Sequence, residues 1–125
     1  MSSRTMLDRY RTGVGHLAHI LHRISGLALA GYLLIHIIDI GAVTRGGATS
    51  FNEAMAVFDT PFWKIMDALL VAAVLFHAFN GIRILMFDAG VGIKYQKSLF
   101  WISLLLTLAI FLMVFIKVVT NIAAS

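Results

Sequence analysis

Hydrophobic residues form three long blocks along the chain, over residues 24–43, 62–87 and 99–119, and polar residues gather between them. Each block has about the 20 residues or more that a helix needs to cross the hydrocarbon core of a bilayer. A helix also satisfies its own backbone hydrogen bonds, as any segment in lipid must. The pattern therefore predicts an all-α membrane protein with three transmembrane helices, in a single domain over residues 1–125.

The polar segments predict how these helices are connected. Residues 44–61 are typical of a polar connector, with a turn of helix over 50–58, and residues 88–98 of a tight basic turn. The stretch before residue 24, with its three histidines, is expected to be an interfacial lead-in to the first helix. Because the first block is too long for a signal peptide and lacks a small-residue cleavage pattern, we expect the N-terminus to be retained.

Composition narrows the class of protein further. The chain is 60% hydrophobic and 13% charged, with a mean hydropathy of +0.91, whereas soluble domains carry about 25% charged residues. A soluble globule and a disordered chain are both excluded, because the first cannot hide so much apolar surface and the second is polar. The absence of cysteine excludes disulfides, iron–sulfur ligation and thiol chemistry by this chain.

The net charge of +4 is better explained by membrane orientation than by binding to nucleic acid, because no basic stripe exists outside the apolar blocks. Three basic residues fall on one side of the predicted membrane: Arg45, Lys64 and Lys117. The other seven fall on the opposite side: Arg4, Arg9, Arg11, Arg23, Arg83, Lys94 and Lys97. The richer side is expected to be cytoplasmic, which places the N-terminus inside, in a bacterial inner or plasma membrane or, in a eukaryote, the mitochondrial inner membrane.

Two histidines lie inside the apolar blocks, where ionisable residues are costly and usually functional. At about 1.5 Å of helical rise per residue, His36 lies roughly 21 Å beyond His22, whereas His77 lies about 9 Å from Arg83 at the same membrane edge. The two therefore sit at different depths, and each would need a second metal ligand from another helix. Haem iron bound by axial histidines fits this arrangement, and a structural hydrogen bond is the alternative.

A glycine follows His77 and His22 at the same spacing, at Gly81 and Gly26, one helical turn further on. The missing side chain would let a flat macrocycle approach the backbone, or would let two helices pack closely in lipid. Asp39, three residues after His36, could accept the second ring N–H of that histidine or could be an ordinary interfacial acid.

Two motifs carry a resemblance to a known family: His22-Arg23-Ile24-Ser25-Gly26, and His77-Ala78-Phe79-Asn80-Gly81-Ile82-Arg83 followed by Asp88. They resemble the cytochrome b subunit of succinate dehydrogenase (respiratory complex II), a three-helix anchor related to those of fumarate reductases. The resemblance covers roughly residues 21–90, and the third helix matches only in character. It implies a heteromeric helical bundle in a four-subunit complex, with a flavoprotein subunit, an iron–sulfur subunit and a second membrane anchor subunit as partners.

The resemblance also implies roles for single residues. His77 matches the axial ligand of haem b, and His22 and Arg23 match residues beside the haem propionates and the quinone site. His19 stands one turn before Arg23, where the family often has a quinone-bonding serine, so His19 and Arg23 are the quinone-site candidates. His36 departs from members with one haem and is similar to those with two, which makes His77 and His36 the expected iron ligands and favours two haems.

These observations predict a haem b-binding anchor of a succinate:quinone oxidoreductase, which passes electrons to a membrane quinone. The site for the dicarboxylate lies on another chain, so this subunit belongs to an enzyme complex without carrying its catalytic residues. Two alternatives stay open from the residues alone: a non-redox transporter subunit with proton-relay histidines, and the cytochrome b anchor of another dehydrogenase.

Overall fold

The computed structural model describes residues 13–125, and all of its regular elements are helical. In chain order these are α2 (Val14–Phe58), α3 (Pro61–Asp88), the short 3₁₀ helix η1 (Ile93–Tyr95) and α4 (Gln96–Ala124). Arg4, Arg9 and Arg11 of the charge distribution lie outside the described residues.

Three segments are long and apolar enough to cross a membrane: Val14–Phe58, Pro61–Asp88 and Ile93–Ala124. Their most hydrophobic stretches have mean hydropathies of 1.9, 1.9 and 2.8, and few of the residues in those stretches are buried inside the chain. An apolar surface of this extent requires lipid or partner helices around it. The predicted class, an all-α membrane protein with three transmembrane helices, is confirmed.

The first helix extends beyond the block that the apolar pattern marked, at both ends. It begins at Val14, so the lead-in stretch is part of α2, and it continues through most of the expected connector to Phe58. Inside it, Gly47 has φ 68° and ψ −155°, which interrupts the helical backbone and turns the chain. No proline occurs before Pro61 to stop the helix earlier.

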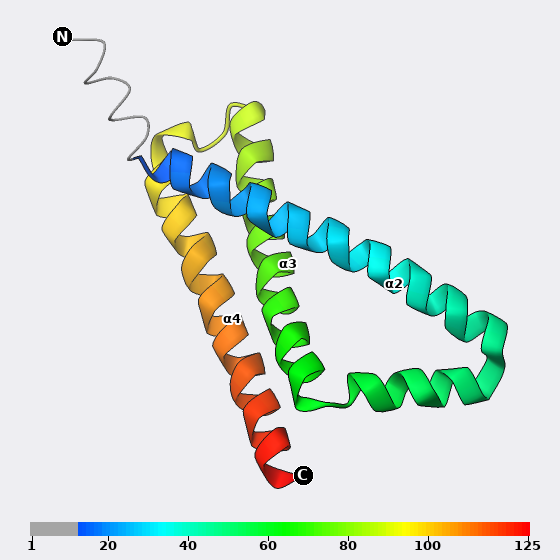
Figure 1. The fold of residues 1–125 in the computed structure, drawn as a ribbon. Coiled ribbons are helices and arrows are strands. Elements are labelled where there is room, and N and C mark those ends of the chain that lie inside the picture. Colours follow the sequence, from blue (N-terminus) through cyan, green and yellow to red (C-terminus); the bar gives the residue numbers. More distant parts are fainter. Residues whose placement is uncertain (1–12) are drawn as a thin grey trace.

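The helices meet mainly at one end of the molecule (Figure 1). α3 and α4 run antiparallel side by side, while α2 crosses them near the α3–α4 turn, diverges, bends and returns to the start of α3. The buried apolar cluster lies at this crossing and contains one residue from each helix: Ala18, Phe76 and Phe100. The Phe76 and Phe100 rings meet edge to face with centroids 6.5 Å apart.

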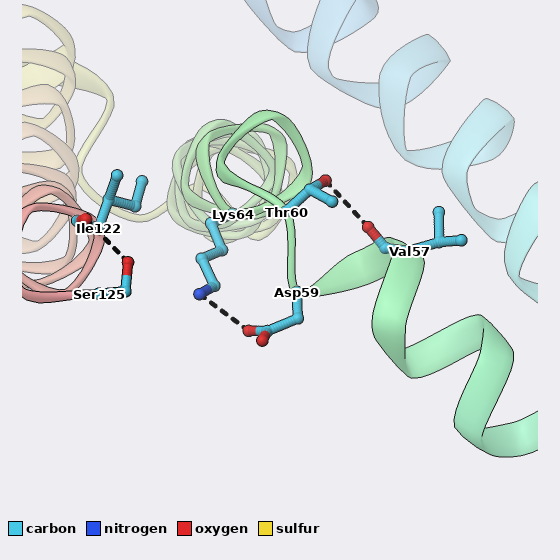
Figure 2. A network of polar contacts seen from close by, with 6 residues as sticks. All are labelled: Val57, Asp59, Thr60, Lys64, Ile122 and Ser125. Atoms are coloured by element: carbon cyan, nitrogen blue, oxygen red, sulfur yellow. Dashed lines mark hydrogen bonds and ion pairs between the residues drawn. The ribbon is translucent and has the colours of Figure 1, made fainter.

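Two turns connect the three long helices. At the α2–α3 turn, the Thr60 hydroxyl donates to the Val57 carbonyl over 2.9 Å and Lys64 pairs with Asp59 at 2.8 Å (Figure 2). At the α3–α4 turn, Gly90 and Gly92 take positive φ angles of 75° and 73°, which residues with a side chain rarely adopt.

Candidate functional site

The crossing of α2 and α3 brings two motif histidines into direct contact. The rings of His22 and His77 stack with centroids 3.9 Å apart and an interplanar angle of 10°. The sequence placed His22 in an interfacial lead-in, yet in the structure it lies more than two turns inside α2, at the same level as His77. The two identical His–Gly spacings in the sequence thus belong to one site rather than to two separate ones.

The glycine one turn after each histidine makes room for the histidine of the other helix. A Cβ added at Gly26 would lie 3.1 Å from Cε1 of His77, and one at Gly81 would lie 3.8 Å from Cε1 of His22. The first distance is too short for an unshifted ring, whereas the second is an ordinary contact. Of the two interpretations of these glycines, close packing of the helices is the one that the contacts support directly.

Two oxygens of α2 surround Nδ1 of His77. The Ser25 hydroxyl oxygen lies 3.1 Å from it and the His22 carbonyl oxygen 3.2 Å from it. A carbonyl oxygen can only accept a hydrogen bond, so Nδ1 carries the proton and donates. In the neutral ring, Nε2 is then the atom with the free lone pair.

The opposite edge of the His77 ring makes no hydrogen bond with residues 13–125. Among residues 13–125, both hydrogen bonds of this ring are made at Nδ1, and the side chain is partly exposed. Nearby, Nδ1 of His22 is buried without a hydrogen-bond partner in the described part of the chain. A neutral imidazole with a free Nε2 and a fixed Nδ1–H is the form in which histidine binds metals, so these residues fit an axial haem ligand.

The chain does not supply a complete metal site at this place. Within residues 13–125, no three His, Cys, Asp or Glu side chains converge on a common point. One axial ligand from this chain with another from a partner would satisfy a haem iron, whereas a structural zinc needs about four protein ligands.

The two quinone-site candidates lie on the outer surface of α2. His19 and Arg23 are both exposed and stand four residues apart, on one face of the helix. Gly26, seven residues after His19, follows on the same side of α2, whereas Ser25 lies further round the helix. Any quinone bound by these two side chains would need the remaining walls of its site from other subunits.

His36 lies away from the histidine pair, on the diverging part of α2. It is exposed, and its ring stacks on Tyr32 of the same helix with centroids 5.3 Å apart. Asp39 lines a shallow pocket of about 250 Å³ between the two arms of the bent helix, with Ser50 and Phe58 on its other side. The structure thus keeps His36 and His77 at separate places, as their spacing in the sequence indicated.

Two buried polar residues of α3 have surroundings that the sequence did not reveal. Arg83 is 8% exposed, lies over the rings of Phe87 and Phe100 at 5.3 and 5.6 Å, and donates to the Gln96 carbonyl over 3.4 Å. Its guanidinium is therefore packed among the helices of this chain rather than exposed on their surface. Asn80 is 1% exposed, and neither polar atom of its amide has a partner within residues 13–125.

Ser25 is the site residue to which the sequence gave no role. Its signal was present in the motif, because a serine three residues after a histidine shares a helix face with it. The pairing with His77 on another helix, however, depends on how α2 crosses α3.

The fold and the site together define a class: a small helical membrane protein with a histidine pair at a helix crossing. The family model of the succinate dehydrogenase/fumarate reductase transmembrane subunit matches residues 3–118. The chain belongs to this family and is a membrane anchor subunit of the succinate dehydrogenase and fumarate reductase type. Membership implies that it works with the other subunits of such a complex, and it separates the chain from the transporter alternative.

Curated relatives agree with the family. The chain is 39% identical over 94 residues to succinate dehydrogenase 2 membrane subunit SdhC of Mycobacterium tuberculosis, covering 74% of this chain and 68% of that protein. It is 34% identical over 94 residues to the succinate dehydrogenase hydrophobic membrane anchor subunit of Halobacterium salinarum, covering 74% and 72%. The corresponding subunit of Archaeoglobus fulgidus is 32% identical over 99 residues, covering 79% and 81%. These bacterial and archaeal relatives imply a plasma membrane as the location.

Proposed function

We propose that this subunit binds haem b through Nε2 of His77 and helps to pass electrons from succinate to a membrane quinone. The observation that carries the proposal is the hydrogen bonding of the His77 ring. Nδ1 donates to two oxygens of α2, which leaves the lone pair of Nε2 free to bind iron. The second axial ligand would come from the other membrane anchor subunit, because His22 stacks face to face on His77 and so lies on the same side of any iron bound there. When bound, the haem would supply a one-electron relay.

The partner subunits follow from the chemistry of the route. Succinate would be oxidised on a flavoprotein subunit, and an iron–sulfur subunit would carry the electrons to the membrane, because this chain has no cysteine to ligate a cluster. The quinone site would lie at the cytoplasmic edge, where protons are available. There Arg23 would hold a quinone oxygen or a haem propionate and stabilise developing negative charge, and His19 would donate a hydrogen bond to the quinone.

The orientation is part of the proposal. Arg23, Arg83, Lys94 and Lys97 lie near the α3–α4 turn or the first turns of α2, whereas Lys64 and Lys117 lie toward the opposite end of α3 and α4. The positive-inside rule places the end with the larger number of basic residues in the cytoplasm, together with the N-terminus.

We propose a second haem at His36. This imidazole is exposed on the diverging arm of α2, where a neighbouring chain can reach it, and it is far from the pair at the crossing. It too would need its second ligand from the partner anchor. Two haems at two depths would shorten each electron-transfer step across the membrane.

The test is haem content in the intact complex. The complex is purified from membranes, reduced with dithionite and quantified by its b-type absorption bands, and succinate-driven quinone reduction is measured on the same sample. His77→Ala is expected to lower the content by one haem per complex, because the iron loses an axial ligand.

His36→Ala serves as the matched variant, since it removes the other membrane-embedded histidine. It is expected to remove a different haem and to leave the one at His77. Full haem content in His77→Ala would refute that ligand assignment, and full content in His36→Ala would leave the complex with a single haem on this chain. A complex without b-type bands, with all subunits present, would refute haem binding altogether.

A further inference from the structure

Ser25 has an unusual set of hydrogen bonds for a hydroxyl in a membrane helix. It is 7% exposed, and its Oγ lies 2.9 Å from the carbonyl oxygen of His22 and 3.1 Å from Nδ1 of His77. Serine and threonine in helices commonly bond a carbonyl three or four residues earlier, as Ser103 and Thr107 do here. Among the described hydroxyl groups, Ser25 alone also bonds a side chain of another helix.

The hydrogen atoms of this triangle can be assigned. The hydroxyl has one hydrogen, which it donates to the His22 carbonyl of its own helix. Its lone pairs therefore remain to accept, and the proton between Oγ and Nδ1 comes from the ring of His77. The His22 carbonyl, 3.2 Å from the same Nδ1, accepts from it as well.

This assignment fixes both the tautomer and the direction of the ring. Two acceptors on α2 hold the Nδ1–H of a histidine on α3, so the ring cannot flip without leaving an N–H unpaired in a low-dielectric interior. Gly26 on the neighbouring turn leaves only enough room for this ring, because an added methyl group would come within 3.1 Å of Cε1, and His22 stacks on the face of the ring with centroids 3.9 Å apart. The ring is thus oriented by hydrogen bonds at one edge and by packing at its side.

We propose that Ser25 is a positioning residue for His77, which keeps Nε2 as the iron-binding atom and sets how strongly it donates electrons to the metal. The inference rests on the proposed haem binding. A hydrogen bond accepted from the distal N–H of a ligating imidazole raises the basicity of that ligand. Stronger donation favours the ferric form, so Ser25 lowers the reduction potential of the haem.

The experiment measures the haem potential in the intact complex by redox titration of the b-type bands. Ser25→Ala removes one of the two acceptors. It is expected to raise the equilibrium ratio of ferrous to ferric haem by about tenfold, which raises the reduction potential by about 59 mV for one electron. The ferric low-spin resonance signal should shift with it. Ser25→Thr keeps the hydroxyl and should restore the original potential.

Ser103→Ala is the matched control, because Ser103 is also buried and bonds a carbonyl of its own helix without touching His77. It should leave the potential unchanged. If Ser25→Ala fails to assemble with haem, the haem potential is measured in Ser25→Cys instead. The cysteine side chain is of similar size but its sulfur is a weak acceptor, so this variant should also raise the potential.

The outcomes separate this inference from the proposed function. Haem that depends on His77, with an unchanged potential in Ser25→Ala or Ser25→Cys, overturns the role of Ser25 and leaves haem binding intact. A shift in Ser103→Ala equal to that in Ser25→Ala overturns it too, because the effect would then be general loosening of the bundle. Absence of haem from the wild-type complex overturns both.

Discussion

Gly26 limits how closely α2 can approach α3 at the histidine pair. A Cβ at this position would meet Cε1 of His77 at 3.1 Å, and its other near neighbour is Nδ1 of the same ring at 3.6 Å. The ring cannot retreat freely, because Nδ1 is held by Ser25 and the His22 carbonyl. A methyl group at Gly26 therefore competes directly with the orientation of the proposed ligand.

Gly26→Ala is expected to lower the haem occupancy at His77 and to destabilise the complex by about 1–3 kcal/mol, because the added methyl overpacks a constrained ring. Haem content and thermal inactivation of the purified complex provide the measurements. Gly31→Ala is the matched control, since a Cβ there meets nothing within 4 Å. Gly81→Ala, whose Cβ would lie 3.8 Å from His22, should resemble the control. Equal behaviour of all three variants would show that the ring of His77 moves aside without cost.

Much of the site could be predicted at the residue scale. His22, His77 and their glycines were singled out because identical spacings put small residues one turn from an imidazole, a pattern that needs no tertiary information. The partner of each group could not be predicted. That Gly26 faces His77, or that Ser25 bonds its Nδ1, depends on the crossing of two helices separated by about fifty residues.

α2 is the element that shapes the molecule, because it is bent once and packed along only part of its length. Its first turns cover the α3–α4 pair, its middle diverges, and after Gly47 it returns to the start of α3 (Figure 1). Residues 14–46 alone would extend about 50 Å, more than the roughly 30 Å of a hydrocarbon core. A helix of this length spans by tilting, which is consistent with its oblique course across α3 and α4.

The bend depends on glycine. With φ 68° and ψ −155°, Gly47 occupies a backbone region that is essentially closed to residues with a side chain. Gly47→Ala is expected to destabilise the complex by about 1–3 kcal/mol, through backbone strain and not through a clash, since a Cβ there meets nothing within 4 Å.

Thermal unfolding of the assembled complex, compared with Gly31→Ala, checks this prediction. Gly31 lies within the regular part of α2 with equal free space, so alanine there should be neutral or stabilise the helix by up to about 1 kcal/mol. A Gly47→Ala complex as stable as the wild type would mean that the bend is not fixed at this residue.

The apolar pattern could not mark the ends of this element. Residues 14–23 and 48–58 contain enough polar side chains to fall outside the hydrophobic blocks, yet they are helical, because helix formation depends on the backbone and on amphipathic packing rather than on overall hydropathy. The α3–α4 turn was easier to place, since Gly90 and Gly92 supply the positive φ angles that it requires.

The whole molecule is incomplete as a folded unit. Its buried apolar residues are Ala18, Ala68, Phe76 and Phe100 within the described chain, and none of the most hydrophobic stretch of α2 is buried. Large side chains such as Leu27, at 74% exposure, point away from the other helices. Lipid covers part of this surface, and the remaining anchor of the complex is the expected partner for the diverging arm of α2.

Expression of the chain with and without its partner anchor tests this dependence. His77 can give an iron one protein ligand, and His22 is stacked beside it on the same side, so the chain alone is expected to retain little low-spin haem. Co-expression should restore the full six-coordinate b-type spectrum. Absorption and low-temperature resonance spectra of purified membranes provide the readout. Stable low-spin haem in the chain alone would show that two copies of it supply both ligands.

By itself the sequence determined the class and the number of membrane spans and named the candidate ligand residues, because hydropathy, segment length and residue type are properties of each segment alone. The tertiary structure alone decided which of those residues meet. The stacking of His22 on His77 and the hydrogen bond from Nδ1 to Ser25 both arise from the way in which α2 crosses α3. That crossing is set by packing between helices far apart in the chain, which no single segment encodes.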